Sequence, residues 1–233
     1  MVIFLPFRVS LSEKDNIMHS VQAEMQARWN SDGWHYDDAH AHGVNSETER
    51  ARWRFLLSGF PKGTKLLDAG TGTGFVALIG AELGLDVTGA DWSETMLAQA
   101  REKADRQNLI VRLVQSKIET LPFEQNSFDA LAARHVIWTL AEPVRAFSEW
   151  RRVLVPGGAV IADYAPRKGD RHIGQHYSEE TERKLPLNRD VSPEELAGLF
   201  REAGFTGVSF SAHEREIRHE ESSKQVFVFT CVK

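Results

Sequence analysis

The chain has 233 residues, of which 42% are hydrophobic and 26% charged, a balance typical of one globular domain with a full core. Its formal net charge of -5 argues against a nucleic-acid-binding protein, because that binding depends on clustered Lys and Arg. The single cysteine, Cys231, excludes an internal disulfide and favours a reducing compartment. No run approaches the roughly 18 apolar residues of a membrane helix. We therefore expect a cytoplasmic protein without membrane contact.

Residues 11–58 are polar, rich in aromatic side chains and expected to be helical in pieces. The apolar start MVIFLPF has no basic region before it and no cleavage site after it, so we do not expect a signal peptide. Met1 and Met18 both qualify as the start. Residues 28–44 suggest irregular structure, whereas Glu47 to Leu57 is predicted to be a helix with Ser46 as its N-cap.

From Thr64 onward, short apolar runs alternate with amphipathic segments. The predicted strands are 65–69, 86–90, 110–114, 128–133 and 159–164, and the predicted helices are 75–83, 93–104 and 143–154. This alternation indicates an α/β domain whose mostly parallel sheet has helices on both faces.

The alternation of strands and helices is interrupted at residues 166–191 by a long polar insertion. Insertions of this length are usually functional or disordered. A helix from Ser192 and Pro193 to Ala203 follows, with Gly204 as its C-terminal glycine. Two final strands, 206–210 and 225–232, complete a set of seven, and the last is expected to pair antiparallel with the one before it.

A glycine-rich turn carries the strongest chemical signal. The predicted buried strand Leu66–Ala69 ends in Gly70, Gly72 and Gly74 at the start of a helix, where backbone can approach a ligand closely. The carboxylate of Asp68 suits an ammonium or sulfonium group better than a pyrophosphate. A dinucleotide fingerprint counted from Gly72 is nevertheless satisfied, so a nicotinamide cofactor stays open.

A second signal is Asp91, which ends the next predicted strand 21 residues beyond Gly70. A carboxylate there can accept hydrogen bonds from both ribose hydroxyls, although it can also serve the helix N-terminus. Trp92 and Met96 follow, and either side chain can lie against an adenine ring.

The block from Lys65 to Gly158 resembles class I S-adenosylmethionine-dependent methyltransferases, in particular the broad family that includes the ubiquinone and menaquinone methyltransferases. The resemblance extends beyond the glycine turn and Asp91 to 121–123 (LPF), 127–129 (SFD) and 152–158 (RVLVPGG), in the right order. It implies a Rossmann-like, seven-stranded sheet with a reversed last strand and an N-terminal helical lid. The implied division is a lid at 1–58 and a cofactor domain at 59–233, whose insertion at 166–191 covers the acceptor.

The resemblance also implies roles for individual residues. Asp68, Gly70 and Gly72 would shape the pocket for the methionine end of the cofactor, and Ile118 would place its backbone against adenine. Arg134 would lie under the sulfonium. Many relatives have an acidic residue where this chain has Lys117, and lysine cannot accept the hydrogen bond of the adenine amino group.

Candidates for acceptor chemistry lie outside these motifs. His135 follows the fourth predicted strand, and Tyr36 and His40 lie in the N-terminal segment. Each can orient an acceptor or take its proton, and each can equally be a packing residue. The histidine pairs 40/42 and 172/176 have ligand-like spacing without supporting Cys or Glu, so we expect no metal.

These features together predict an S-adenosylmethionine-dependent methyltransferase that acts on a small molecule and binds no nucleic acid. A nicotinamide-dependent oxidoreductase and a non-catalytic S-adenosylmethionine-binding regulator or scaffold are the alternatives. The sequence does not name the acceptor, the methylated atom or the oligomeric state.

Overall fold

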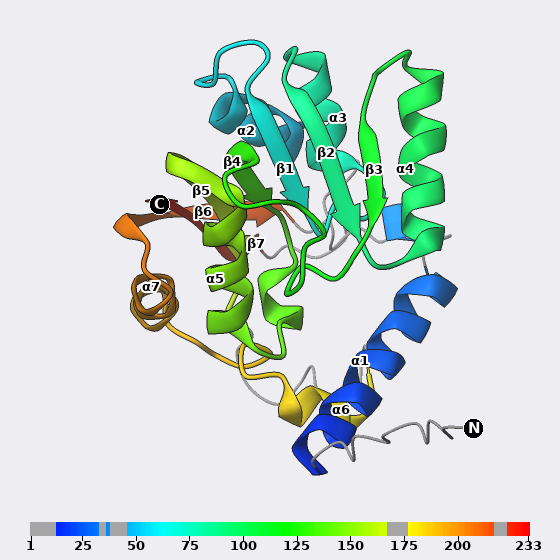
Figure 1. Cartoon of the computed structure of the whole chain (residues 1–233), viewed down its shortest axis with the longest axis vertical. Coiled ribbons are helices and arrows are strands. Elements are labelled where there is room, and N and C mark those ends of the chain that lie inside the picture. Colours follow the sequence, from blue (N-terminus) through cyan, green and yellow to red (C-terminus); the bar gives the residue numbers. More distant parts are fainter. Residues whose placement is uncertain (1–12, 33–35, 38–45, 167–176, 217–222) are drawn as a thin grey trace, which may run out of the picture.

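The computed structural model describes residues 13–32, 36–37, 46–166, 177–216 and 223–233, which form a seven-stranded sheet with flanking helices (Figure 1). The order across the sheet is β3-β2-β1-β4-β5-β7-β6. The strands are β1 (Lys65–Ala69), β2 (Asp86–Asp91), β3 (Arg112–Gln115), β4 (Phe128–Ala133), β5 (Leu154–Tyr164), β6 (Thr206–Glu216) and β7 (Ser223–Val232). β1 to β5 are parallel, and β7 runs antiparallel to both β5 and β6. The predicted sheet with a reversed last strand is therefore confirmed.

Helices cover both faces of the sheet, as the alternating pattern predicts. They are α1 (Glu13–Asp32), α2 (Glu47–Leu57), α3 (Phe75–Glu82), α4 (Glu94–Arg106), α5 (Pro143–Val153), α6 (Glu179–Lys184) and α7 (Pro193–Glu202). Side chains of α2 and α3 form one core cluster, and those of α5 and α7 belong to the other. α4 packs beside β2 and β3 at the edge of the sheet (Figure 1).

The period of two along a strand explains why one sheet serves two cores. Leu66 packs in the cluster with α2 and α3, whereas the next residue, Leu67, packs in the cluster with α5. Neighbouring side chains of a strand point to opposite faces, so a strand covered on both sides carries apolar side chains on both faces, and its buried polar residue, Asp68, is held by hydrogen bonds.

Three helices begin where serine caps were predicted. The side-chain oxygens of Ser46, Ser93 and Ser192 accept hydrogen bonds from backbone N–H groups of the first turns of α2, α4 and α7, at 3.3, 3.2 and 3.1 Å. These bonds satisfy N–H groups that have no partner within the helix. Such local signals are legible from sequence because donor and acceptor lie three residues apart.

The predicted irregular stretch at 28–44 is wrong in its first part, because α1 continues to Asp32. The last carbonyls of α1 are satisfied from a distant part of the chain: the hydroxyls of Ser93 and Thr95 donate to the carbonyls of Trp29 and Asn30 at 3.2 and 2.9 Å. Residues 33–35 and 38–45 lie outside the described residues.

β5 and β6 extend well beyond their predicted bounds. β5 begins at Leu154 rather than 159, because Leu154 pairs with Phe128, and the extra residues of β5 before Ala159 form an irregularity in the pairing with β4. β6 extends to Glu216 because it pairs with β7 along its length. Cross-strand pairing, which local propensity does not report, sets both bounds.

The second half of the predicted insertion packs on the sheet domain. Tyr177, Leu185 and Leu187 are buried in the cluster that contains α5. The hydroxyl of Tyr164, at the end of β5, donates to the carbonyls of Leu187 and Arg189 at 3.3 and 2.9 Å. The first half, 167–176, lies outside the described residues, and the role predicted for 166–191 stays a prediction.

The predicted boundary at residue 58 also stays a prediction. α2 lies on its N-terminal side, yet Trp53 and Leu57 of this helix are fully buried against Leu66 and the α3 side chains. α2 is therefore part of the helical layer of the sheet, while α1 lies apart from that layer beyond the strand ends (Figure 1).

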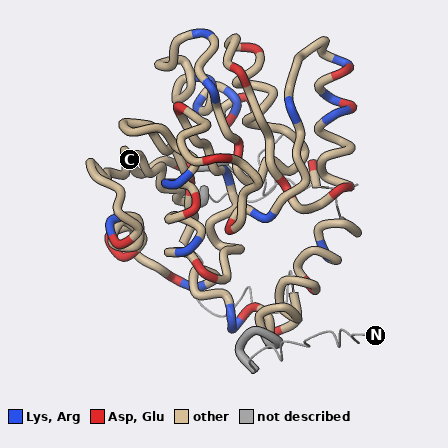
Figure 2. Tube along the Cα trace, viewed as in Figure 1, with Lys and Arg blue, Asp and Glu red and all other residues tan. Residues whose placement is uncertain are grey.

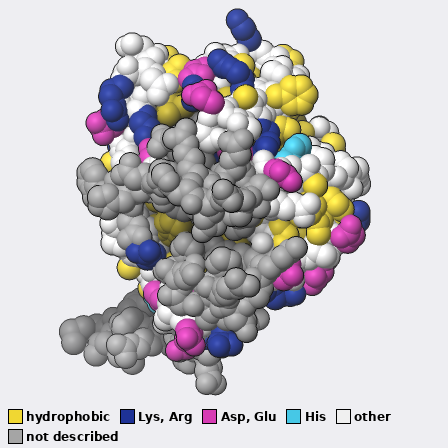
Figure 3. Space-filling model, turned by 180° about the vertical axis from the view of Figure 1, so that it is seen from behind, with side chains coloured by type: hydrophobic (Ala, Val, Ile, Leu, Met, Phe, Trp, Pro, Cys, Tyr) yellow, Lys and Arg dark blue, Asp and Glu magenta, His cyan; other side chains and the backbone are white. Residues whose placement is uncertain are grey.

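Acidic and basic side chains are mixed over the surface, for example along α4 (Figure 2). On the opposite face, the apolar, acidic and basic side chains of the described residues are also intermixed (Figure 3). Of the described residues, the large hydrophobic ones that are exposed are Phe55, Ile110 and Val232, on three separate segments. Within the same residues, no helix has the length and apolar character required to span a membrane.

Candidate functional site

The carboxyl ends of β1, β2 and β4 meet at one edge of the sheet. Ala69 pairs with Ala90, and Asp68 pairs with Ala132, so the residues that follow these strands converge. The crevice outside the carboxyl ends of parallel strands is the usual ligand site of an open α/β sheet.

The turn after β1 is built on backbone that requires glycine. Gly70 has a φ of 75°, and a Cβ there would lie 2.6 Å from the Cγ2 atom of Val136. Gly72 has a φ of 53° and donates its N–H to the Oδ2 atom of Asp91 at 2.9 Å. The turn is therefore locked between β4 and β2.

Asp91 joins this turn to the start of α4. Its two carboxylate oxygens accept backbone N–H bonds from Gly72 and Ser93, each at 2.9 Å. Burial raises the pKa of this carboxyl, and the backbone hydrogen bonds oppose that rise. A carboxylate has about four acceptor sites, so two are left for a ligand.

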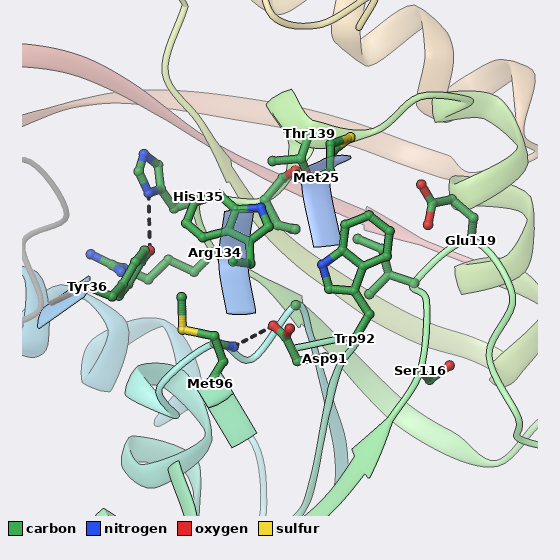
Figure 4. A pocket seen from close by; sticks show the side chains of 15 residues that line it. Met25, Tyr36, Asp91, Trp92, Met96, Ser116, Glu119, Arg134, His135 and Thr139 are labelled. Atoms are coloured by element: carbon green, nitrogen blue, oxygen red, sulfur yellow. Dashed lines mark hydrogen bonds between the residues drawn. The ribbon is translucent and has the colours of Figure 1, made fainter. Parts of the chain in front are cut away.

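A cavity of about 640 Å³ lies over these strand ends (Figure 4). Its walls are mainly apolar and aromatic, and they come from α1, the glycine turn, the segments after β2, β3 and β4, and the residue pair 36–37. The lining residues are Met25, Trp29, Tyr36, Gly70, Gly72, Asp91, Trp92, Met96, Ser116, Ile118, Glu119, Arg134, His135, Val136 and Thr139.

α1 closes one side of this cavity and is fixed there by polar bonds. The amide of Gln26 donates to the carbonyl of Trp92 at 3.2 Å, and Lys117 donates to the Oε1 atom of Gln22 at 2.7 Å. On its other side, Glu24 accepts hydrogen bonds from the backbone and hydroxyl of Ser178, at 2.5 and 2.8 Å. α1 therefore bridges the strand-end loops and the segment around α6.

A second, smaller cavity of about 280 Å³ shares Tyr36, Gly70, Gly72 and Arg134 with the first and also contacts Asp68. The Oδ2 atom of Asp68 accepts the Thr71 hydroxyl at 2.7 Å and the N–H of Ala77 at 3.0 Å. Burial is the largest cause of its raised pKa, about 6, and the two hydrogen bonds oppose it. This compartment offers a carboxylate beside the N-terminus of α3.

His135 has an unusual backbone. Its φ is 57°, a left-handed conformation that is rare for non-glycine residues. Asp163, buried at the end of β5, holds it there by accepting the His135 N–H at 2.5 Å, and Trp138 donates its indole N–H to the His135 carbonyl at 3.0 Å. Backbone strain of this kind concentrates at functional sites.

Tyr36 contacts His135, although the two residues are 99 positions apart in the sequence. The tyrosine hydroxyl lies 3.4 Å from the Nδ1 atom of His135 at the rim of the cavity (Figure 4). The next residue, Asp37, accepts the hydroxyl of Thr73 at 2.6 Å and forms an ion pair with Lys103. Tyr36 is thereby held near the glycine turn through its neighbour Asp37.

Arg134 lines both cavities and is itself buried. Its guanidinium lies 4.2 Å from the ring centroid of Phe75 and pairs with Glu49 of α2 at 3.7 Å. A buried guanidinium needs such a counter-ion, because an unpaired charge is strongly penalised there.

The structure gathers most of the residues that the sequence singled out. Eight predicted cofactor or catalytic residues lie along the main cavity: Tyr36, Gly70, Gly72, Asp91, Trp92, Met96, Ile118 and His135. Arg134 reaches both cavities and Asp68 the smaller one. Gly74 lines neither; it is the N-cap of α3, and a Cβ there would press on Ala100 at 3.1 Å. His40 lies outside the described residues.

Several site residues were missed by the sequence. Met25 and Trp29 were not proposed because α1 was not placed beside the strand ends. Asp37 bonds to Thr73 and Asp163 bonds to His135, and in each pair the two residues lie far apart in the sequence. No group of three or more His, Cys, Asp or Glu side chains in the described ranges is arranged to hold a metal ion.

A family model described as "Methyltransferase domain" matches residues 67–162 of this chain. A demethylmenaquinone methyltransferase of Thermus thermophilus is 36% identical over 143 residues, which cover 58% of this chain and 64% of that protein. A ubiquinone biosynthesis O-methyltransferase of Roseobacter denitrificans is 30% identical over 153 residues, 63% of this chain and 62% of that protein. The chain thus spans less than two thirds of the length of these relatives.

Solved structures share the fold. Phosphoethanolamine N-methyltransferase 2 of Haemonchus contortus, in complex with phosphomonomethylethanolamine and S-adenosylhomocysteine, aligns with a TM-score of 0.66 at 20% identity. The alignment covers 81% of this chain and 53% of that one. At this identity, the likeness concerns the fold alone.

Proposed function

We propose that this chain, which belongs to the class I S-adenosylmethionine-dependent methyltransferases, transfers the cofactor's methyl group to a small-molecule acceptor. The observation that carries the proposal is the shape of the turn after β1. A Cβ on Gly70 would collide with Val136, and Gly72 bonds to Asp91, so bare backbone faces the cavity beside a carboxylate.

The residues present fit an adenosyl amino acid. Asp91 has two acceptor sites left for the hydroxyls of a ribose. Asp68, in the smaller cavity, offers a carboxylate to the ammonium of the methionine end. We assign Trp92, Met96 and Ile118 to the faces and edge of the base. When bound, the cofactor supplies an electrophilic methyl group on a sulfonium.

The chain's own contribution to transfer is positioning and exclusion of water. Met25 and Trp29 of α1 close the cavity over the strand ends. We propose that His135 and Tyr36 hold the acceptor at the rim and that His135 takes its proton, directly or through the Tyr36 hydroxyl. The 3.4 Å contact between the Tyr36 hydroxyl and the His135 Nδ1 atom supports this pairing.

We favour a hydroxylated aromatic ring as the acceptor. Trp29 and Tyr36 line the cavity and their rings meet edge to face at 6.0 Å, while the buried Trp138 packs 6.2 Å from Trp29 and supports it. Such walls suit a flat ring. The curated relatives named above are quinone-biosynthesis methyltransferases, which supports the same class. The single cysteine supports a reducing compartment such as the cytoplasm.

Two measurements test the proposal. Calorimetric titration with S-adenosylhomocysteine and, separately, with NADH is expected to show binding of the first ligand only. Incubation with S-adenosylmethionine and a panel of short-chain demethylquinols, catechols and aliphatic amines is expected to form S-adenosylhomocysteine fastest with a hydroxylated ring. Binding of NADH alone would refute the methyltransferase assignment. Cofactor binding without turnover of any acceptor would favour the non-catalytic alternative.

A further inference from the structure

We infer that Glu119 is the side chain that recognises the exocyclic amino group of the cofactor's purine, while the adjacent Lys117 is committed to holding α1. The inference rests on the proposed function, because it assumes that an adenosyl ligand occupies the main cavity. It assigns purine specificity to a residue that the sequence did not single out.

The cavity has two chemically different ends, with Asp91 between them. Tyr36 and His135 lie at one end, and Ser116 and Glu119 lie at the other (Figure 4). The smaller cavity with Asp68 adjoins the Tyr36 end, since it shares Tyr36 with the main one. A nucleoside that places its ribose on Asp91 and its amino-acid arm toward Asp68 must extend its base toward Glu119.

Most other polar groups at that end are engaged with the protein. The hydroxyl of Ser116 donates to the carbonyls of Lys117 and Thr120, at 2.9 and 3.1 Å. The carbonyl of Trp92 accepts from Gln26 and Gln115, at 3.2 and 3.0 Å. The Trp92 carbonyl therefore has both acceptor positions filled, and the Ser116 hydrogen is engaged, although the Ser116 oxygen can still accept a hydrogen bond.

The Ile118 carbonyl and the Lys117 ammonium at this end of the cavity are also hydrogen-bonded within the protein. The carbonyl of Ile118 accepts the indole N–H of Trp150 at 3.1 Å. The ammonium of Lys117 is bonded to Gln22 of α1 at 2.7 Å. The cation is thus tied to α1, and Glu119 provides the charged acceptor at this end of the cavity, which binds an N–H donor more strongly than a hydroxyl or carbonyl oxygen does.

The carboxylate of Glu119 has the capacity for a ligand bond. It lines the cavity, is half-buried and accepts a hydrogen bond from its own backbone N–H. A carboxylate has about four acceptor sites, so capacity remains. Burial raises the pKa of this carboxyl, and an N–H donor from a ligand would relieve part of that penalty.

Adenine and hypoxanthine differ at the position that this carboxylate would face. Adenine carries an amino group, which donates, whereas hypoxanthine carries a carbonyl oxygen, which repels a carboxylate. Glu119 should therefore favour an adenosyl ligand over an inosyl ligand. Glutamine has an amide that can both accept and donate, so Glu119→Gln should remove most of this preference.

The test measures dissociation constants of S-adenosylhomocysteine and S-inosylhomocysteine by calorimetry for three full-length proteins. The native protein is expected to prefer the adenosyl ligand by about tenfold or more, as for a hydrogen bond to a charged group. Glu119→Gln is expected to reduce that ratio to within about threefold. The matched control, Lys117→Met, is expected to leave the ratio unchanged, whatever it does to both affinities through α1.

The outcomes distinguish a wrong assignment of Glu119 from a wrong assignment of the methyltransferase function. An unchanged ratio in Glu119→Gln, or a ratio altered in Lys117→Met instead, would overturn the assignment of Glu119 while leaving the methyltransferase intact. Failure of the native protein to bind S-adenosylhomocysteine at all would reject the proposed function on which the assignment rests. Thermal unfolding of each variant is measured alongside, and Glu119→Gln is nearly isosteric at a half-buried position.

Discussion

Replacement of Asp91 by alanine is expected to weaken S-adenosylhomocysteine binding by about 1–3 kcal/mol, or roughly 5- to 150-fold. The carboxylate already accepts the N–H groups of Gly72 and Ser93. Two acceptor sites are left for the ribose hydroxyls, and each charge-assisted bond contributes about 1.5–3 kcal/mol. The net loss is smaller than their sum, because water hydrates the freed hydroxyls in the variant.

The assay is calorimetric titration with S-adenosylhomocysteine, whose sulfur is uncharged. The measured loss then reports the sugar contact rather than a long-range attraction between Asp91 and a sulfonium. Glu94→Ala is the matched control, since Glu94 is an exposed carboxylate at the start of the same helix. Its affinity is expected to stay within about twofold of the native value.

Loss of the two backbone bonds can also loosen the glycine turn, so the unfolding temperature of Asp91→Ala must be compared with that of Asp91→Asn. Asparagine keeps one acceptor oxygen and is expected to lose less affinity than alanine. Native-like affinity in Asp91→Ala, with the fold intact, would show that the ribose lies elsewhere and that the site has been oriented wrongly.

Three further outcomes are expected. His135→Ala should lower turnover by about 100-fold or more while changing S-adenosylhomocysteine affinity little, and Tyr36→Phe should lower it less; equal turnover in the native protein and His135→Ala would remove the histidine from the mechanism. Asp37→Ala and Lys103→Ala should each lower turnover, and the double variant should lose less than the sum of the two single losses, because the two side chains share an ion pair; additive losses in kcat would contradict this. The free-protein pKa of Asp68, about 6, means that ammonium binding must displace a proton at lower pH, so affinity should rise from pH 5 to pH 7 and then level off; a slope that survives in Asp68→Asn would assign it to another group.

Short-range signals in the sequence predicted the local geometry around the turn after β1 and the start of α4. The turn after β1 follows from glycines spaced two apart, and the start of α4 follows from Ser93, whose partner N–H lies three residues away. Asp91 was found because it ends a strand next to that turn. In each case the residues that cooperate lie within about one supersecondary unit, where spacing alone constrains geometry.

The sequence did not predict the contacts that hold α1 and His135 in place, for a physical reason. The end of α1 depends on hydroxyls from Ser93 and Thr95, more than 60 residues away. The left-handed backbone of His135 depends on Asp163, from the next strand of the sheet. Such bonds form only after the sheet has been assembled, and no local pattern reports them.

The difference between local contacts around the glycine turn and long-range contacts around α1 suggests where substitutions could change the acceptor. The cofactor side is held by backbone contacts among β1, β2 and β4, so few substitutions there leave it intact; Gly70 tolerates no Cβ. The acceptor side is assembled from side-chain bonds between α1, residues 36–37 and the segment around α6, as the bonds of Glu24 and Asp37 illustrate. Side chains on such connecting segments can be exchanged without disturbing the sheet. We therefore expect substitutions in the turn and at Asp91 to disturb the site, whereas α1 and Tyr36 are the places where a change of acceptor should be sought.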